Sequence, residues 1–108
     1  MKILEVRRGE TPELKEIDGG LDSMQAIVGG YIEAIYPFDD DIAVVVNEEG
    51  KITGLPPNRF LVYKKQNYVE PLCGTLFLCG LKKDSFADIP KKLADKYTKV
   101  FSPDIIYI

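Results

Sequence analysis

The sequence predicts an α+β fold, a mostly antiparallel sheet of about five strands with two helices packed on one face. Apolar residues recur at helical spacing in residues 21–28 and again in residues 90–101. Short β-branched runs, separated by turn residues, lie between and around these two segments and are typical of strands. A chain of 108 residues is the usual length of one domain, so we expect residues 1–108 to fold as a single unit.

The chain begins with an alternating segment, Lys2–Arg8, which predicts an N-terminal strand rather than the apolar core of a signal peptide. Residues 9–15 contain a Thr-Pro pair and mixed charges, so we expect a loop or an irregular helical turn there. A short extended piece at residues 16–17 and a turn at residues 18–20 then lead into the first helix.

The stretch at residues 21–38 organises the predicted fold. Its first part has apolar residues on one face of a helix, namely Leu21, Met24, Ile27 and Val28. Gly29 and Gly30 follow at the helix end, where a left-handed residue is needed and only Gly adopts that conformation freely. Residues 31–38 are rich in β-branched and aromatic types, which predicts a strand. We therefore expect the Gly pair to fold the helix back against this strand.

A three-stranded antiparallel meander is predicted over residues 31–53. Asp39–Asp41 is expected to be a solvated turn and not a Ca²⁺ loop, because the alternating oxygen ligands and distal Glu of such a loop are absent. The apolar run Ile42–Val46 predicts a central strand buried on both faces. Asn47–Lys51 has the composition of a hairpin turn, after which residues 52–53 are expected to return as a short strand.

The loop that follows is the predicted partner-binding segment. Its two adjacent prolines fix φ and lack a backbone donor, so we expect the loop to stay outside the central ladder. A stiff loop that presents an amide and a guanidinium is suited to ligand or partner contacts. The candidate partner-binding residues are Pro56, Pro57, Asn58 and Arg59. In the alternative interpretation, Asn58 caps the turn and Arg59 pairs with an acidic neighbour.

The C-terminal third is predicted to hold one strand and one helix. Residues 64–70 are polar and indicate an exposed connection, whereas residues 75–81 indicate another buried strand. Residues 84–88 have the spacing of a capping box, which predicts a helical turn, and residues 90–101 form an amphipathic helix that begins at a proline. The tail, residues 104–108, is apolar to its last position, so it either adds a strand to its own sheet or docks on a second copy as a homodimer.

The residue types argue against an enzyme. The chain has no His, no paired Cys motif and no Gly-rich phosphate loop, so we expect no catalytic residue, no cofactor and no metal site. Cys73 and Cys79 lie in a stretch predicted to be largely strand, where their separation of about 20 Å would prevent a disulfide. No apolar run reaches the ~18 residues of a membrane span, and we expect a cytoplasmic protein with no membrane contact.

Charge is distributed unevenly along the chain. Residues 1–50 hold four Lys and Arg against twelve Asp and Glu, whereas residues 51–108 hold ten against five. Either the two halves pack together and neutralise each other, or an acidic and a basic face serve a charged partner or a second copy. The lysines of the second half include a candidate nucleic-acid patch, Lys82, Lys83, Lys92, Lys96 and Lys99.

Several motifs occur in an order that resembles a known family. They are MQAIVGGYIE at residues 24–33, VNEEGK at residues 46–51, LPPNR at residues 55–59 and GTLFLCG at residues 74–80. The family is an uncharacterised domain-of-unknown-function family of small proteins from Gram-positive bacteria, their phages and conjugative elements. The resemblance covers most of residues 21–80 and implies a phage or mobile-element setting, sometimes near antirestriction genes. It implies no activity, so it assigns no catalytic residue.

We therefore expect a non-enzymatic accessory protein of phage or mobile-element type that acts as a protein-binding module. An antirestriction DNA mimic is one alternative, but such a protein imitates about one negative charge per 1.7 Å of duplex, and a net charge of −3 imitates it poorly. Nucleic-acid binding through the lysine patch is the other alternative, and the acidic balance of the whole chain argues against it.

Overall fold

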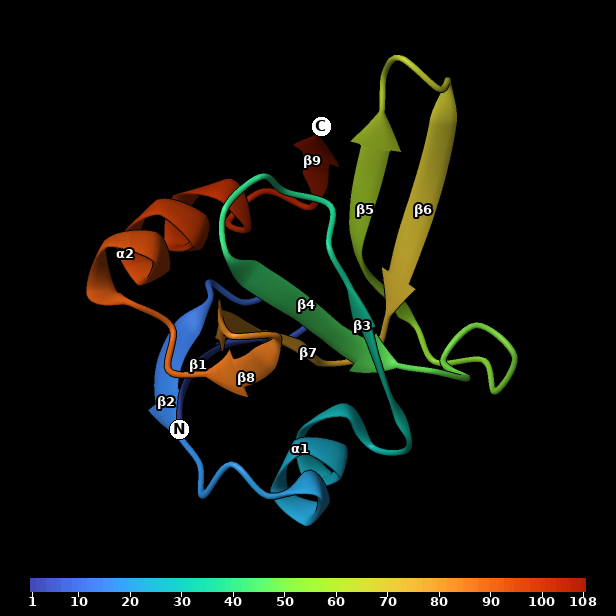
Figure 1. Cartoon of the computed structure of the whole chain (residues 1–108). Coiled ribbons are helices and arrows are strands. Elements are labelled where there is room, and N and C mark those ends of the chain that lie inside the picture. Colours follow the sequence, from blue (N-terminus) through green and yellow to red (C-terminus); the bar gives the residue numbers. More distant parts are fainter.

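The computed structural model describes residues 1–108 as two sheets and two helices (Figure 1). The larger sheet has the strand order β2-β1-β7-β4-β3, with β8 paired to the end of β7, and the smaller sheet has the order β6-β5-β9. The elements in chain order are β1 (Lys2–Val6), β2 (Glu13–Glu16), α1 (Leu21–Val28), β3 (Ile32–Ile35), β4 (Ile42–Asn47), β5 (Pro57–Tyr63), β6 (Tyr68–Cys73), β7 (Leu76–Lys82), β8 (Ser85–Ala87), α2 (Lys91–Val100) and β9 (Ile105–Tyr107).

The α+β class and the mostly antiparallel pairing are confirmed, because every strand pair except β5 with β9 is antiparallel. The structure has more strands than expected, and they form two sheets. The two helices lie on opposite faces of the larger sheet, not on one (Figure 1). The alternation of side chains along the central strands explains this, because each face of β4 and β7 is apolar and each needs a cover.

The first helix has the predicted bounds, and its buried residues are Met24 and Val28. Gly29 is left-handed, with φ of 79°, as the sequence predicts. Gly30 is not left-handed and is required for a different reason. A Cβ atom there would lie 2.8 Å from Nδ2 of Asn47, which donates a hydrogen bond to the carbonyl of Val28. Gly29 therefore ends the helix, and Gly30 leaves room for the side-chain amide of Asn47, at the end of β4.

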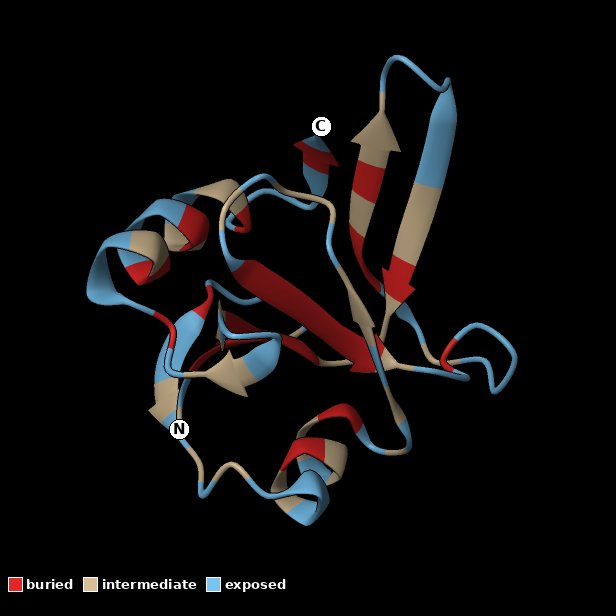
Figure 2. Ribbon diagram, viewed as in Figure 1, coloured by how far each residue is buried: buried red, intermediate tan, exposed pale blue.

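The central strands β4 and β7 are buried along most of their length, as expected (Figure 2). One face packs against α1 in a cluster that contains Ile3, Met24, Val28, Ala43, Val45, Phe77 and Cys79. The other face packs against α2 and the smaller sheet in a cluster that includes Val44, Leu61, Leu78, Tyr97, Phe101 and Ile106. This second cluster joins the two sheets into one core.

The predicted meander over residues 31–53 is wrong in its third strand. Residues 48–54 form turns closed by hydrogen bonds from the amide and hydroxyl of Thr53 to the carbonyl of Glu49. The second neighbour of β4 is β7, which comes from the other half of the chain. The prediction failed because a local hairpin signal competes with a distant apolar strand, and the burial of β4 between β3 and β7 decides the pairing.

Two further segments are strands that the sequence pattern did not predict. Residues 13–16 form β2, which pairs with β1, in place of a loop or helical turn. Residues 84–88 contain β8 in place of a helical turn. Lys83 and Asp84 both have positive φ, 51° and 64°, which is the geometry of a two-residue hairpin turn whose twist suits paired strands.

The second helix confirms the amphipathic prediction, with Ala94 and Tyr97 buried. The helix also forms hydrogen bonds to the Asp39–Asp41 turn, so that turn is not simply solvated. The carboxylate of Asp40 accepts hydrogen bonds from Nζ of Lys96 at 2.6 Å and from the hydroxyl of Tyr97 at 2.7 Å. These two bonds hold the pKa of Asp40 below its ordinary value, and the bond from Lys96 contributes most.

The smaller sheet holds the remaining corrections. The expected loop at residues 54–59 ends where β5 begins, at Pro57, with an irregular register between Pro57 and Arg59. The expected connection at residues 64–70 consists of the turn between β5 and β6 and the first half of β6. The tail pairs in parallel with β5 as β9, which is the first of the two predicted alternatives. Neither helix has the length and apolar character needed to cross a membrane.

Candidate functional site

Arg59, one of the predicted partner-binding residues, is buried, with only 1% of its surface exposed. Its Nε donates to the carbonyl of Phe101 at 2.8 Å, and its Nη2 donates to the carbonyl of Glu10 at 2.6 Å. Its Nη1 donates to Oδ1 of Asn58 at 2.7 Å and lies 3.8 Å from the carboxylate of Asp104. Burial lowers the pKa of the Arg59 guanidinium, although arginine stays charged in proteins.

Asn58 is also buried, at 3% exposure. Its Nδ2 donates to the carbonyls of Val6 and Gly74, at 2.8 and 3.0 Å. Arg59 thus lies near an acidic residue, Asp104, as in the alternative interpretation, whereas Asn58 bonds two distant carbonyls and does not cap the turn. Of the four candidate partner-binding residues, only Pro56 and Pro57 are exposed. The physical reason is that chain segments far apart in the sequence end here with unpaired carbonyls, and these two side chains supply the donors.

The smaller sheet, which Asn58 and Arg59 support from within, has two different faces. Side chains alternate along a strand, so paired residues share a face. The inner face carries Leu61, Leu72 and Ile106, which belong to the core. The opposite face, which we call the outer sheet face, carries six apolar residues and no charged one, namely Phe60, Val62, Val69, Pro71, Ile105 and Tyr107.

No element of the chain covers the outer sheet face. Val69, Ile105 and Tyr107 are 52%, 48% and 62% exposed, and Phe60, Val62 and Pro71 are half-buried. Figure 2 shows the exposed ends of β6 and β9 beside the partly buried β5. Nζ of Lys64 lies 4.8 Å from the centre of the Tyr107 ring and borders the face at one end. A continuous apolar face with a polar border is typical of a protein interaction site.

The strand β9 also leaves one edge of this sheet open. The carbonyl of Asp104 accepts from the amide of Phe60, and the amide of Ile108 donates to the carbonyl of Val62. Because backbone groups alternate in direction along a strand, the amides and carbonyls of Ile105 and Tyr107 point away from β5. No strand lies beyond them in the sheet. These groups are free to pair with another strand.

Arg59 determines where β9 lies. Its bond to Phe101 and its ion pair with Asp104 hold the segment between α2 and β9, and the aromatic ring of Phe101 is itself fully buried. A hollow of about 500 Å³ opens beside this segment, lined by Arg8, Gly9, Pro57, Asn58, Phe60 and Asp104. Asn58 and Arg59 thus hold in place the strands that form the outer sheet face and the hollow beside it. Arg59 itself does not reach the surface.

The family described as Domain of unknown function (DUF3846) matches residues 1–102. The chain belongs to the DUF3846 family. The sequence resemblance to a domain-of-unknown-function family is confirmed to this extent. The DUF3846 match includes the larger sheet, both helices and the strands β5 and β6, and it ends before β9. No curated protein and no solved structure matches the chain.

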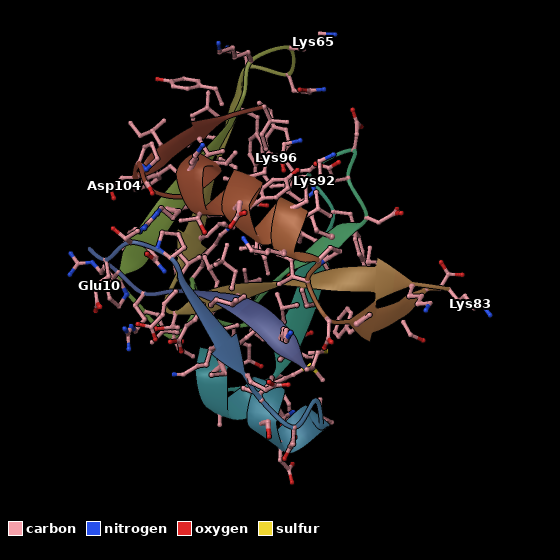
Figure 3. All side chains as sticks on the ribbon, turned by 90° about the vertical axis from the view of Figure 1, so that its left-hand side faces the viewer. Glu10, Lys65, Lys83, Lys92, Lys96 and Asp104 are labelled. Atoms are coloured by element: carbon pink, nitrogen blue, oxygen red, sulfur yellow. The ribbon has the colours of Figure 1, made fainter.

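The lysines that the sequence grouped as a patch do not form one surface in this DUF3846 chain. Figure 3 shows Lys83 at the tip of the β7–β8 hairpin, well separated from Lys92 and Lys96 on α2. Lys96 is bound to Asp40, and Lys91 pairs with Asp95 at 3.0 Å. Asp40, from the first half of the chain, therefore neutralises one lysine of the helix, and Asp95, from the same helix, neutralises another.

The outer sheet face was not predicted from the sequence. The apolar tail gave part of the signal, but Val69 was assigned to an exposed connection, and the strands that carry Phe60, Val62 and Pro71 were not predicted. Prolines at positions 57 and 71 hid these strands, because Pro normally argues against a strand. In this DUF3846 chain, β6 is an edge strand and the other proline lies at the first position of β5, where proline is tolerated.

Proposed function

We propose that this DUF3846 chain is a non-enzymatic protein-binding module, and that it binds its partner through the outer sheet face. The observation that supports this proposal is the set of six apolar residues on three strands with no cover from the chain itself. A small protein that leaves such a face in water loses the free energy that burial would supply, about 25 cal/mol for each Å². A partner that covers the face recovers it.

The proposal extends to an accessory role in a phage or mobile element. This setting is supported by the resemblance of residues 21–80 to proteins of such elements. It agrees with binding by a surface rather than by a reaction, because the resemblance implies no activity. The partner of the outer sheet face is accordingly expected to present an apolar patch of its own.

The test compares two exposed tyrosines, Tyr107 on the outer sheet face and Tyr31 outside it, which are 62% and 67% exposed. A photo-crosslinking amino acid replaces each in turn, and the full chain is irradiated in an extract of host cells that carry the element. We expect a discrete adduct with a host protein from position 107 and none from position 31. Adducts of equal yield from both positions would overturn the proposal.

A second measurement ties any adduct to the apolar face. The captured protein is purified, and its affinity is measured for the wild-type chain, for Val69→Lys and for the control Glu49→Lys. A charge within an apolar interface should weaken binding by about tenfold or more, whereas the control should bind like the wild type. Equal affinity of Val69→Lys and wild type would place the interface elsewhere.

A further inference from the structure

From the open edge of the smaller sheet we infer that two copies of the chain pair through β9 and form one continuous six-stranded sheet. This inference rests on the proposed function and specifies how the binding surface is completed. Its basis is the direction of the backbone groups in β9. The amides and carbonyls of Ile105 and Tyr107 point away from β5, while those of Ile106 point toward it.

This arrangement is self-complementary. In an antiparallel pair with its two-fold axis at Ile106, Ile105 of one copy lies opposite Tyr107 of the other, and the reverse pair is related by symmetry. Each of these two pairs exchanges two backbone hydrogen bonds, so all four outward-pointing groups of each β9 are satisfied. On the outer sheet face each pair places a β-branched residue beside an aromatic one, which is a favourable cross-strand contact.

Charged side chains of different kinds lie at the two ends of the smaller sheet. Lys64 and Lys65 lie in the turn beyond the end of β5, whereas Asp104 precedes β9 at the opposite end. Figure 3 shows Lys65 at the far end of the hairpin from both Asp104 and Glu10. The two-fold axis reverses the direction of the second copy, so Lys64 and Lys65 of each copy lie at the same end of the dimer sheet as Asp104 of the other copy, which already pairs with Arg59.

The size of the outer sheet face also indicates that one copy is not sufficient. Three strands at a spacing of about 4.8 Å form a strip roughly 14 Å wide, and β9 overlaps β5 for only about 10 Å of its length. A stable interface buries about 800 Å² on each partner. Pairing through β9 doubles the strip to roughly 29 Å and joins twelve apolar side chains in one surface.

The decisive experiment measures the mass of the full chain by light scattering over a range of concentrations. We expect the wild type to have the mass of two chains. Tyr107→Pro removes an outward-pointing amide without touching the amides that bond to β5, and we expect it to be monomeric. Tyr107→Thr is the matched control, because it removes the ring but keeps the amide, and we expect it to remain dimeric.

Other outcomes of these measurements would overturn the inference. A wild-type chain that is monomeric at all concentrations would do so. A dimer that Tyr107→Thr and Phe60→Ser disrupt as strongly as Tyr107→Pro would indicate face-to-face packing of the outer sheet faces instead. A monomeric chain that still forms the adduct from position 107 with a host protein would overturn the dimer and leave the proposed function standing.

A crosslinking measurement tests the register, in a Cys73→Ser background. Ile105→Cys and Tyr107→Cys chains are oxidised separately and as a mixture. Opposed residues in an antiparallel pair are about 5.5 Å apart between Cα atoms, within disulfide range. We expect a crosslinked dimer from the mixture and little from either chain alone. Equal yields from the separate chains and the mixture would contradict the register.

Hydrogen exchange gives an independent check of the pairing. The backbone amides of residues 105 and 107 should gain protection as the protein concentration rises.

Discussion

At the scale of single residues, Arg59 illustrates how a small core uses a charged side chain. Its guanidinium meets carbonyls from two distant segments and the side chain of the preceding residue, with no buried polar side-chain atom left unpaired in the structure. A planar group with five donors can serve several acceptors at fixed angles, which a lysine ammonium cannot. The residue therefore determines how the chain beyond α2 meets β5.

We predict that Arg59→Met lowers the free energy of unfolding by about 3 kcal/mol, because the carbonyls of Glu10 and Phe101 lose their donor inside the protein. Arg59→Lys should lower it less but still measurably, since one ammonium cannot reach both carbonyls. Urea denaturation followed by circular dichroism measures both. The exposed Arg8→Lys is the control, with a change within about 0.5 kcal/mol. An Arg59→Lys variant as stable as this control would contradict the role of the guanidinium.

A second prediction concerns the acid sensitivity of Asp40. The hydrogen bonds from Lys96 and Tyr97 lower its pKa in the folded state, so they stabilise the fold above the unfolded-state pKa of about 4 and are lost as pH falls through the lower folded value. The melting temperature of the wild type should therefore fall more steeply below pH 4 than that of Asp40→Asn. Parallel curves for the two proteins between pH 2 and pH 6 would show that this carboxylate makes no contribution.

At the scale of elements, the two helices, the central strands and the pairing of β3 with β4 could be predicted from the sequence, whereas the other strand partners could not. Residues 21–28 and 90–101 have a periodicity that depends only on local spacing, and the run at residues 42–46 is apolar enough to indicate burial. The second partner of β4 is β7, more than thirty residues further along the chain, and no local pattern specifies such a pair.

The candidate site was predicted in part for the same reason. Pro56 and Pro57 are at the surface, but Asn58 and Arg59 are buried because their acceptors come from β1, the residue 10 turn and the end of α2. Polar residues beside prolines are usually exposed, and only the tertiary arrangement shows that distant carbonyls converge there. The apolar tail did indicate an interaction surface, but not the strands that complete it.

The end of α1 allows a prediction about how an element is joined to its neighbour. Gly30→Ala should displace the amide of Asn47 from the carbonyl of Val28, at a cost of about 1 kcal/mol. Asn47→Ala removes the same bond. The double variant should therefore be no less stable than the worse single one, and thermal melting of all four proteins measures this coupling. Costs that simply add would show that Gly30 and Asn47 act independently.

Gly29 provides the contrast, because a Cβ atom there would meet nothing within 4 Å and the cost of a side chain is purely conformational. We expect Gly29→Val to lose more stability than Gly29→Asn, since Asn tolerates a left-handed φ and a β-branched residue does not. The difference in melting temperature between the two variants measures it. Similar melting temperatures would indicate that the helix can end in another way.

At the scale of the whole molecule, one apolar cluster extends from the larger sheet through α2 to the smaller sheet. The side of the larger sheet that carries α1 has its own smaller cluster, so each face of the central strands is covered by a different part of the chain. The outer sheet face is the exception to this coverage. Both faces of the central strands are therefore covered by other parts of the chain, whereas the outer sheet face is not.

The two cysteines report on this organisation. Cys79 is completely buried in the cluster beside α1, and burial raises the pKa of its thiol to about 11, whereas Cys73 is half-buried at the end of β6. We predict that a thiol reagent at pH 8 modifies Cys73 in the native protein and reaches Cys79 only after unfolding. Mass spectrometry of the two peptides measures this order. Equal reaction at both positions in native protein would indicate frequent opening of the larger sheet.

The position of β7 has a consequence for synthesis. This strand lies between β1 and β4, so neither of those earlier strands has its second partner until residues 76–82 leave the ribosome. The nascent chain therefore carries β1 and β4 with one edge unpaired until β7 is synthesised, and it can close its core only after that. Fragments released by premature termination upstream of this strand should therefore be targets of chaperones and proteases, while the finished protein is not.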